Sequence, residues 1–69
     1  MNIAKFVQEI NVIDPDTKDN VSMSVFKHEQ SNGMFAIDSS YLDQCFDDDK
    51  NIIIYDPLDF GEKLLLTGV

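Results

Sequence analysis

The sequence predicts an α+β fold: a small, mainly antiparallel sheet with one short helix packed on it, in the order β-β-β-α-β-β. Short apolar runs, alternating or β-branched, are separated by clusters of Asp, Asn, Pro and Gly, which is typical of strands and turns. One group of helix-capping residues, 38–40, is followed by an apolar stripe and interrupts the strands once. Because 69 residues leave room for one hydrophobic core, residues 1–69 are expected to form a single small acidic domain.

Residues 6–13 are compatible with a strand or a helix. The apolar residues at the start of this segment recur at helical spacing, whereas Phe6, Ile10 and Val12 also share one face of a strand. The strand is favoured because the segment ends in β-branched residues and stops at Pro15, which pushes the preceding residue into extended geometry.

Residues 21–27 and 34–37 are expected to form the next two strands, paired antiparallel. The first of them alternates serines with apolar residues, so its apolar face is expected to be the buried one: Val21, Met23 and Val25. Asn32-Gly33 between the strands tolerates positive φ and indicates a tight reversal.

A short helix is expected over residues 39–46. Asp38-Ser39-Ser40 offers helix-capping side chains, and Ser40 with Asp43 approximates a capping box. The helix would present one apolar stripe to the sheet, packing chiefly through Leu42 and Phe46: Tyr41, Leu42, Cys45 and Phe46.

Residues 51–55 and 64–67 are expected to be the last two strands. The first is a β-branched run closed by Asp56-Pro57, and the second follows the turn at Gly61. A 69-residue domain without a disulfide has little core, and its sheet has open edges. We therefore expect a homodimer, joined through a sheet edge or through the aliphatic residues 64–66.

The charge is strongly acidic, with 13 Asp and Glu against five Lys, no Arg and a net charge of −8. Nucleic-acid and anionic-lipid binding need a basic face, so neither direct binding of nucleic acid nor docking on a membrane is expected. The charge serves either solubility alone or a partner with a basic surface. No apolar run resembles a signal peptide or a membrane span, so a cytoplasmic location is expected.

Residues suited to catalysis are scarce, and we expect no enzyme, cofactor or metal. His28 is expected to be exposed near a strand end, and Cys45 to be a buried, inert thiol. No glycine-rich phosphate loop is present, and calcium-loop patterns starting at Asp14 or Asp47 lack the required glycine and glutamate. Core packing is the expected role of the aromatic residues: Phe6, Phe26, Phe35, Tyr41, Phe46, Tyr55 and Phe60.

The candidate interaction face consists of acidic residues from two neighbouring parts of the chain, which are expected to share one face: Asp43, Asp47, Asp48, Asp49, Asp56, Asp59 and Glu62.

Three hypotheses for the function remain. The first hypothesis is a non-enzymatic protein–protein interaction module that uses this face and an exposed sheet edge. The second is a DNA-mimic inhibitor of a restriction or CRISPR nuclease. The third, a small enzyme or metal-dependent hydrolase, would need residues from a partner subunit. An ordinary binding face needs an apolar centre inside a polar rim, whereas mimicry needs carboxylates at phosphate-like spacing.

Two segments resemble a pattern in short uncharacterised acidic proteins of bacteria, phages and plasmids. They are residues 33–44, GMFAIDSSYLDQ, and residues 56–62, DPLDFGE, followed by a closing apolar strand. The resemblance implies a context of mobile or accessory genes. It implies no activity, and no functional residue is carried over from it.

Overall fold

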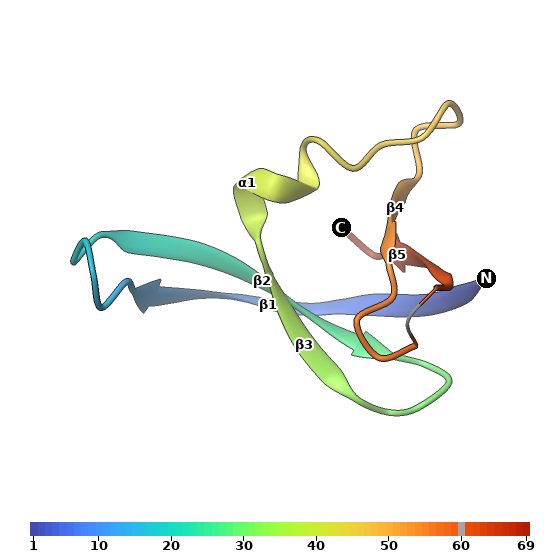
Figure 1. Cartoon of the computed structure of the whole chain (residues 1–69), viewed down its shortest axis with the longest axis horizontal. Helices are drawn as coiled ribbons and strands as arrows, with labels where there is room; N and C mark the ends of the chain where they lie inside the picture. Colours follow the sequence, from blue (N-terminus) through green and yellow to red (C-terminus); the bar gives the residue numbers. More distant parts are fainter. Residues whose placement is uncertain (60) are drawn as a thin grey trace.

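A computed structural model describes residues 1–59 and 61–69 (Figure 1). Its elements follow the predicted order: β1 (Asn2–Ile13), β2 (Asn20–His28), β3 (Met34–Asp38), α1 (Ser39–Leu42), β4 (Ile52–Tyr55) and β5 (Lys63–Thr67). The first segment is a strand, as favoured over a helix, and it begins earlier than expected. No helix among the described residues is long and apolar enough to span a membrane.

All five strands form one sheet in the order β3-β2-β1-β5-β4. The pairs β1–β2, β2–β3 and β4–β5 are antiparallel, but β1 and β5 are parallel, so the sheet is mixed. The parallel pair arises because the chain leaves the β1–β2–β3 meander through α1 and reaches the free side of β1 (Figure 1). β1 is therefore an interior strand, and β3 and β4 are the two edges.

The predicted pairing of β2 with β3 is confirmed, with Ser24 opposite Ile37 and Val25 opposite Ala36. Asn32 adopts a φ of 60° in the connecting turn, in line with its predicted tolerance of positive φ.

The prediction for the buried face of β2 was wrong. Ser24, Phe26 and His28 point into the core, and Val21, Met23 and Val25 point to the opposite face. Phe26 decides this orientation, because its ring is fully buried between Phe6, at 72° and 5.8 Å, and Phe35, stacked at 5.9 Å. The apolar alternation therefore lies on the outer face of the sheet.

The core lies on the inner face of the sheet. Its buried apolar residues come from four elements: Ala4, Phe26, Leu42, Leu64 and Leu66. Phe6, Phe35, Ile37, Ile52 and Ile54 pack against them. Of the remaining aromatics, Tyr41, Phe46 and Tyr55 are exposed, contrary to expectation, and Phe60 lies outside the described residues.

The helix is shorter than predicted and ends at Leu42, which is buried as expected. Its N-cap is Asp38, whose carboxylate accepts the Ser40 N–H at 2.9 Å, so the predicted capping box of Ser40 and Asp43 does not form. The chain then becomes extended, and Phe46 forms a β-bridge with Ile52 instead of packing on the core.

Candidate functional site

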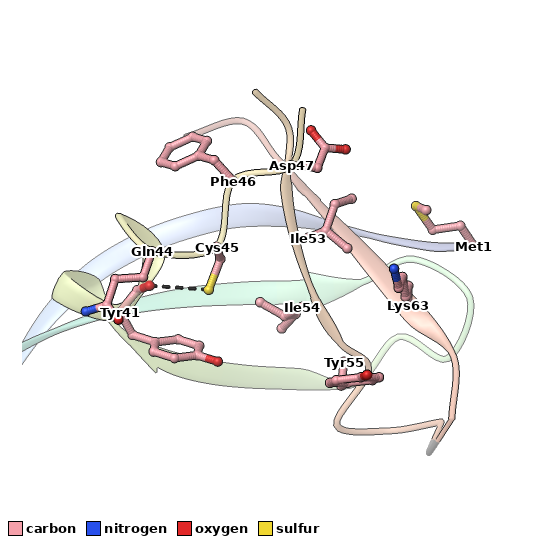
Figure 2. A pocket seen from close by; sticks show the side chains of 10 residues that line it. All are labelled: Met1, Tyr41, Gln44, Cys45, Phe46, Asp47, Ile53, Ile54, Tyr55 and Lys63. Atoms are coloured by element: carbon pink, nitrogen blue, oxygen red, sulfur yellow. Dashed lines mark hydrogen bonds between the residues drawn. The ribbon is translucent and has the colours of Figure 1, made fainter. Parts of the chain in front are cut away.

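An open hollow of about 390 Å³ lies between β4 and the segment that follows α1 (Figure 2). Tyr41, Phe46, Ile53, Ile54 and Tyr55 supply its aromatic and aliphatic walls. Polar and flexible side chains complete the lining: Met1, Gln44, Cys45, Asp47 and Lys63. The hollow thus has an apolar centre and a partly charged rim, the arrangement expected of a protein-binding surface.

Backbone hydrogen bonds fix the wall opposite β4. The Ile53 N–H donates to the Cys45 carbonyl at 2.8 Å, and the Asp47 N–H donates to the Asn51 carbonyl at 2.9 Å. Residues 45–47 therefore run beside the start of β4 like a short extra strand. Cys45, expected to be buried in a helix, is only part-buried here, and its Sγ–H donates to the Tyr41 carbonyl at 3.3 Å (Figure 2).

The far end of β4 has no such neighbour. Backbone groups alternate in direction along a strand, so the Tyr55 N–H points to the same side as the Ile53 N–H, away from β5. Among the described residues it has no backbone partner. This part of the β4 edge is open for pairing with another strand.

Three aromatic side chains that line the hollow have large exposed fractions: 52% for Tyr41, 53% for Phe46 and 78% for Tyr55. Tyr41 and Tyr55 also line a second hollow of about 220 Å³, which extends from β4 to Phe35, Ala36 and Ile37 of β3. The two hollows share Tyr41, Ile54 and Tyr55 in their linings, so they lie side by side between β4 and β3.

The acidic residues named from the sequence are divided by the fold. Asp43, Asp47, Asp48 and Asp49 are exposed in the segment between α1 and β4, where Asp47 lines the hollow. Asp59 and Glu62 are also exposed but follow β4, so they lie at its other end and do not join the first group (Figure 1). Asp56 is 1% exposed and does not belong to any surface.

Asp56 is instead paired with His28, which is 2% exposed, contrary to the expectation of an exposed side chain near a strand end. His28 Nε2 lies 2.7 Å from Asp56 Oδ2, the Asn2 side-chain amide donates to the same oxygen at 2.7 Å, and the Leu58 N–H donates to Oδ1 at 2.8 Å. Burial raises the pKa of Asp56, but the hydrogen bonds from Asn2, His28 and Leu58 outweigh burial and hold the pKa below its ordinary value of 3.8.

This His–Asp pair is built as a structural connection. His28 Nδ1 accepts the Ser31 N–H at 3.2 Å, so Nε2 carries the proton that it donates to Asp56. Both ring nitrogens are thereby occupied, and neither can act as a base toward a substrate. The pair joins the end of β2 to the end of β4. Side chains two residues apart in a strand point to the same face, so the strand that buries Phe26 also points His28 into the core. This spacing is the sequence signal that could have indicated the burial of His28.

Asp47 has a structural role of its own within the acidic segment. Its Oδ1 accepts the Asn51 N–H at 2.8 Å and the Asp49 N–H at 3.0 Å, closing the turn before β4. Asp47→Ala is expected to lower the free energy of unfolding by about 1 kcal/mol, as loss of a cap does. Asp48→Ala, which removes an adjacent exposed carboxylate without such bonds, should change it by less than about 0.5 kcal/mol. Urea unfolding of both variants makes the comparison, and equal effects would contradict the capping role.

Comparisons of the chain with family models, curated proteins and solved structures found no match. Within the described part of the chain, no group of three or more His, Cys, Asp or Glu residues is arranged to hold a metal ion.

Proposed function

We propose that this chain is a non-enzymatic protein–protein interaction module, and that it binds its partner along β4. The observation that carries the proposal is the aromatic hollow beside an open strand edge. Tyrosine is enriched among the residues that dominate interface energetics, because a rigid ring buries a large apolar area and its hydroxyl group can still form a hydrogen bond. Three large aromatic side chains left in solvent by a domain this small are well suited to that role.

The open edge supports a particular mode of binding. An extended segment of the partner can hydrogen-bond to the Tyr55 N–H and continue the line of backbone pairs that residues 45–47 begin on β4. Alternate side chains of such a segment would point into the hollow, against Tyr41 and Ile54 (Figure 2). Main-chain bonds would supply affinity, and the hollow would select apolar side chains.

The exposed acidic group formed by Asp43, Asp47, Asp48 and Asp49 favours a partner that is basic beside this segment. These residues and Lys50 precede β4, so positive charges on the partner would lie at the end of the bound segment nearest to them. In this proposal the charge sets orientation and association rate, and the aromatic residues set affinity.

The inhibitor that imitates DNA is a less well-supported alternative. Such a protein presents a continuous array of carboxylates, whereas here the exposed acidic residues stand at opposite ends of β4 and Asp56 is buried. A small enzyme has less support still, because both nitrogens of the single histidine are already bonded within the protein.

Substitution of Tyr55 tests the aromatic part of the surface. Proteins captured from the native cytoplasm by the tagged chain are identified by mass spectrometry, and the affinity of the purified partner is then measured. Tyr55→Ala is expected to weaken binding at least about tenfold, as truncation of a central aromatic does. Ile13→Ala is the control, because Ile13 is 67% exposed but lies in β1, remote from the hollow. A partner that binds both variants as tightly as the native chain would refute the proposed surface.

The acidic group is tested separately with Asp47, Asp48 and Asp49 all replaced by Asn. The asparagine at position 47 keeps an oxygen that can close the turn, so the fold should be retained. Binding to a basic partner is expected to weaken several-fold at low salt, and this difference should shrink above about 0.1 M salt because exposed charges are screened. Unchanged affinity at low salt would show that these carboxylates serve only solubility.

A further inference from the structure

The distal part of the β1–β2 hairpin projects from the rest of the fold as a ribbon, which β3 flanks only along residues 23–27 of β2 (Figure 1). β5 pairs with β1 only from Asn2 to Lys5, so the ribbon beyond residue 7 has no further strand beside β1. Its inner face carries polar residues, among them Ser24, which hydrogen-bonds to Ser39 of α1 at 2.8 Å. Its outer face carries the apolar residues that the sequence pattern assigned to the core.

These outer residues form a compact strip, because they are direct cross-strand neighbours: Ile10 opposite Met23, and Val12 opposite Val21. Val25 continues the strip on the same side of β2. We call these five residues the outer strip. In a chain with a net charge of −8, the five residues of the outer strip carry no charge, and no element within residues 1–59 and 61–69 packs over them. The neighbouring carboxylate of Asp38, opposite Met23, accepts hydrogen bonds from Ser40 as the cap of α1. An apolar surface of this kind on a small soluble domain indicates a contact surface.

Opposite charges stand at the two ends of the outer strip. At the end near the core, Lys5 and Lys27 are directly opposite each other on the outer face, a like-charge pair that is destabilising in the isolated chain. A bulge at residue 7 keeps both lysines on the face of the strip. At the far end, the turn between β1 and β2 carries the exposed carboxylates of Asp16 and Asp19 with the exposed Lys18 between them, so this end is net acidic. No lysine among the described residues forms a salt bridge within the chain.

We propose that a second copy of this chain covers the outer strip, with the two ribbons face to face and antiparallel about a twofold axis near Ile10 and Met23. This arrangement packs the outer strip of one copy against the outer strip of the other. It also brings the lysine pair of each copy toward the acidic turn of the other, because the pair and the turn lie on opposite sides of the axis. At about 3.3 Å per strand residue, Lys5 is about 17 Å from Ile10, and β1 ends at Ile13, about 10 Å from Ile10 in the other direction, where the turn that contains Asp16 follows.

The charge pattern is what selects a second copy over an unrelated partner. A closed twofold dimer requires a surface that is complementary to itself. Each ribbon has a basic end, an uncharged middle and an acidic end, so two ribbons that run in opposite directions place the basic end of each beside the acidic end of the other. A standard interface buries about 800 Å² on each partner, roughly a sixth of the 4856 Å² surface of this chain. The proposed dimer leaves the hollow beside β4 free, so it is independent of the proposed function.

The first test is sedimentation of the full chain at about 100 µM. The native protein is expected as a dimer of 7.8 kDa subunits, and Val12→Lys as a monomer. Asn11→Lys makes the same charge change one residue away on the opposite, exposed face and should remain a dimer. Circular dichroism verifies that each variant is folded. A native monomer at this concentration, or a Val12→Lys dimer, would overturn the proposal.

A second test uses the charges at the ends of the outer strip. Lys27→Glu and Asp16→Lys each place like charges at both ends of a homodimer, and each is expected to dimerise about tenfold more weakly than the native chain. In a mixed dimer of the two variants, the introduced carboxylate faces the introduced amine, and at the other end the native Lys27 faces the native Asp16. Mixing should therefore restore association, which a fluorescent label on one variant reports.

Lys50→Glu is the matched control for net charge, because Lys50 lies in the segment before β4. It should dimerise within about twofold of the native chain and gain nothing selective from mixing with Asp16→Lys. Equal behaviour of Lys27→Glu and Lys50→Glu would show that only overall repulsion matters and would overturn the antiparallel arrangement. Dimers insensitive to all of these changes would place the contact at another surface, such as an edge strand.

Discussion

Phe26→Ala is expected to leave most of the chain unfolded at 25 °C. The ring is fully buried between Phe6 and Phe35, and removal of a buried phenylalanine side chain costs about 3 to 5 kcal/mol. A domain of this size without a disulfide has about that much stability in total. Circular dichroism and urea unfolding should show loss of the cooperative transition, or a transition displaced nearly to zero urea.

Phe46→Ala is the matched control, since it removes the same atoms from a residue that is 53% exposed. Its cost is expected to be below about 1 kcal/mol, because little buried area is lost. The pair of variants distinguishes the observed core from the one that helical spacing predicts, in which Phe46 packs on the sheet. A stable Phe26→Ala protein beside an unfolded Phe46→Ala protein would reverse the assignment of the core.

The order of elements was predictable because turn residues mark its boundaries. Pro15 ends β1, Asn32 takes the positive φ of the β2–β3 turn, and Asp38 begins α1. The length of α1 was not predictable from its apolar stripe. Phe46 gains a backbone bridge with Ile52 in the extended form, and this long-range pairing replaces the last turns of the expected helix.

The strand order and the faces of β2 could not be read from local pattern. The alternation of serines and apolar residues in β2 specifies two faces but not which one meets the core. Phe26 and His28 settle this, since one large ring and one buried polar pair are accommodated only on the inner side. The parallel placement of β5 beside β1 likewise depends on residues far apart in the sequence. Leu64 and Leu66 pack in the core with Ala4, so the two ends of the chain are in contact.

The candidate site was predictable only in part. The acidic segment 47–49 was visible as a run of aspartates, but the hollow was not, because it forms where Tyr41, separated from β4 in sequence, comes beside Tyr55. Because Asp56 is charged, the sequence also predicts it to be on the surface, whereas it is buried. A carboxylate becomes buried when it has enough donors, and two of the three donors to Asp56 come from residues 2 and 28, far away in the sequence.

Asp56→Ala is expected to lower the free energy of unfolding by about 3 kcal/mol, because it leaves His28 and the Asn2 amide without their buried partner. Asp59→Ala, in the same turn, removes an exposed carboxylate that, among the described residues, accepts one side-chain hydrogen bond, at 3.4 Å from Asn2. It should cost less than about 0.5 kcal/mol. Equal, small losses in urea unfolding would show that the buried pair contributes little.

The lowered pKa of Asp56 adds a dependence on pH with a definite sign. A carboxyl group whose pKa is lower in the folded than in the unfolded chain stabilises the fold fully above its ordinary value of 3.8, and this contribution is lost as the pH falls through the lower folded-state value. Asp56→Asn keeps the shape of the side chain but cannot ionise. The difference in unfolding free energy between the native chain and Asp56→Asn should therefore be constant near about pH 5 and decrease toward about pH 2. A difference that grows on acidification would mean that the folded state favours the protonated carboxyl group, and that the bonds from Asn2, His28 and Leu58 do not outweigh its burial.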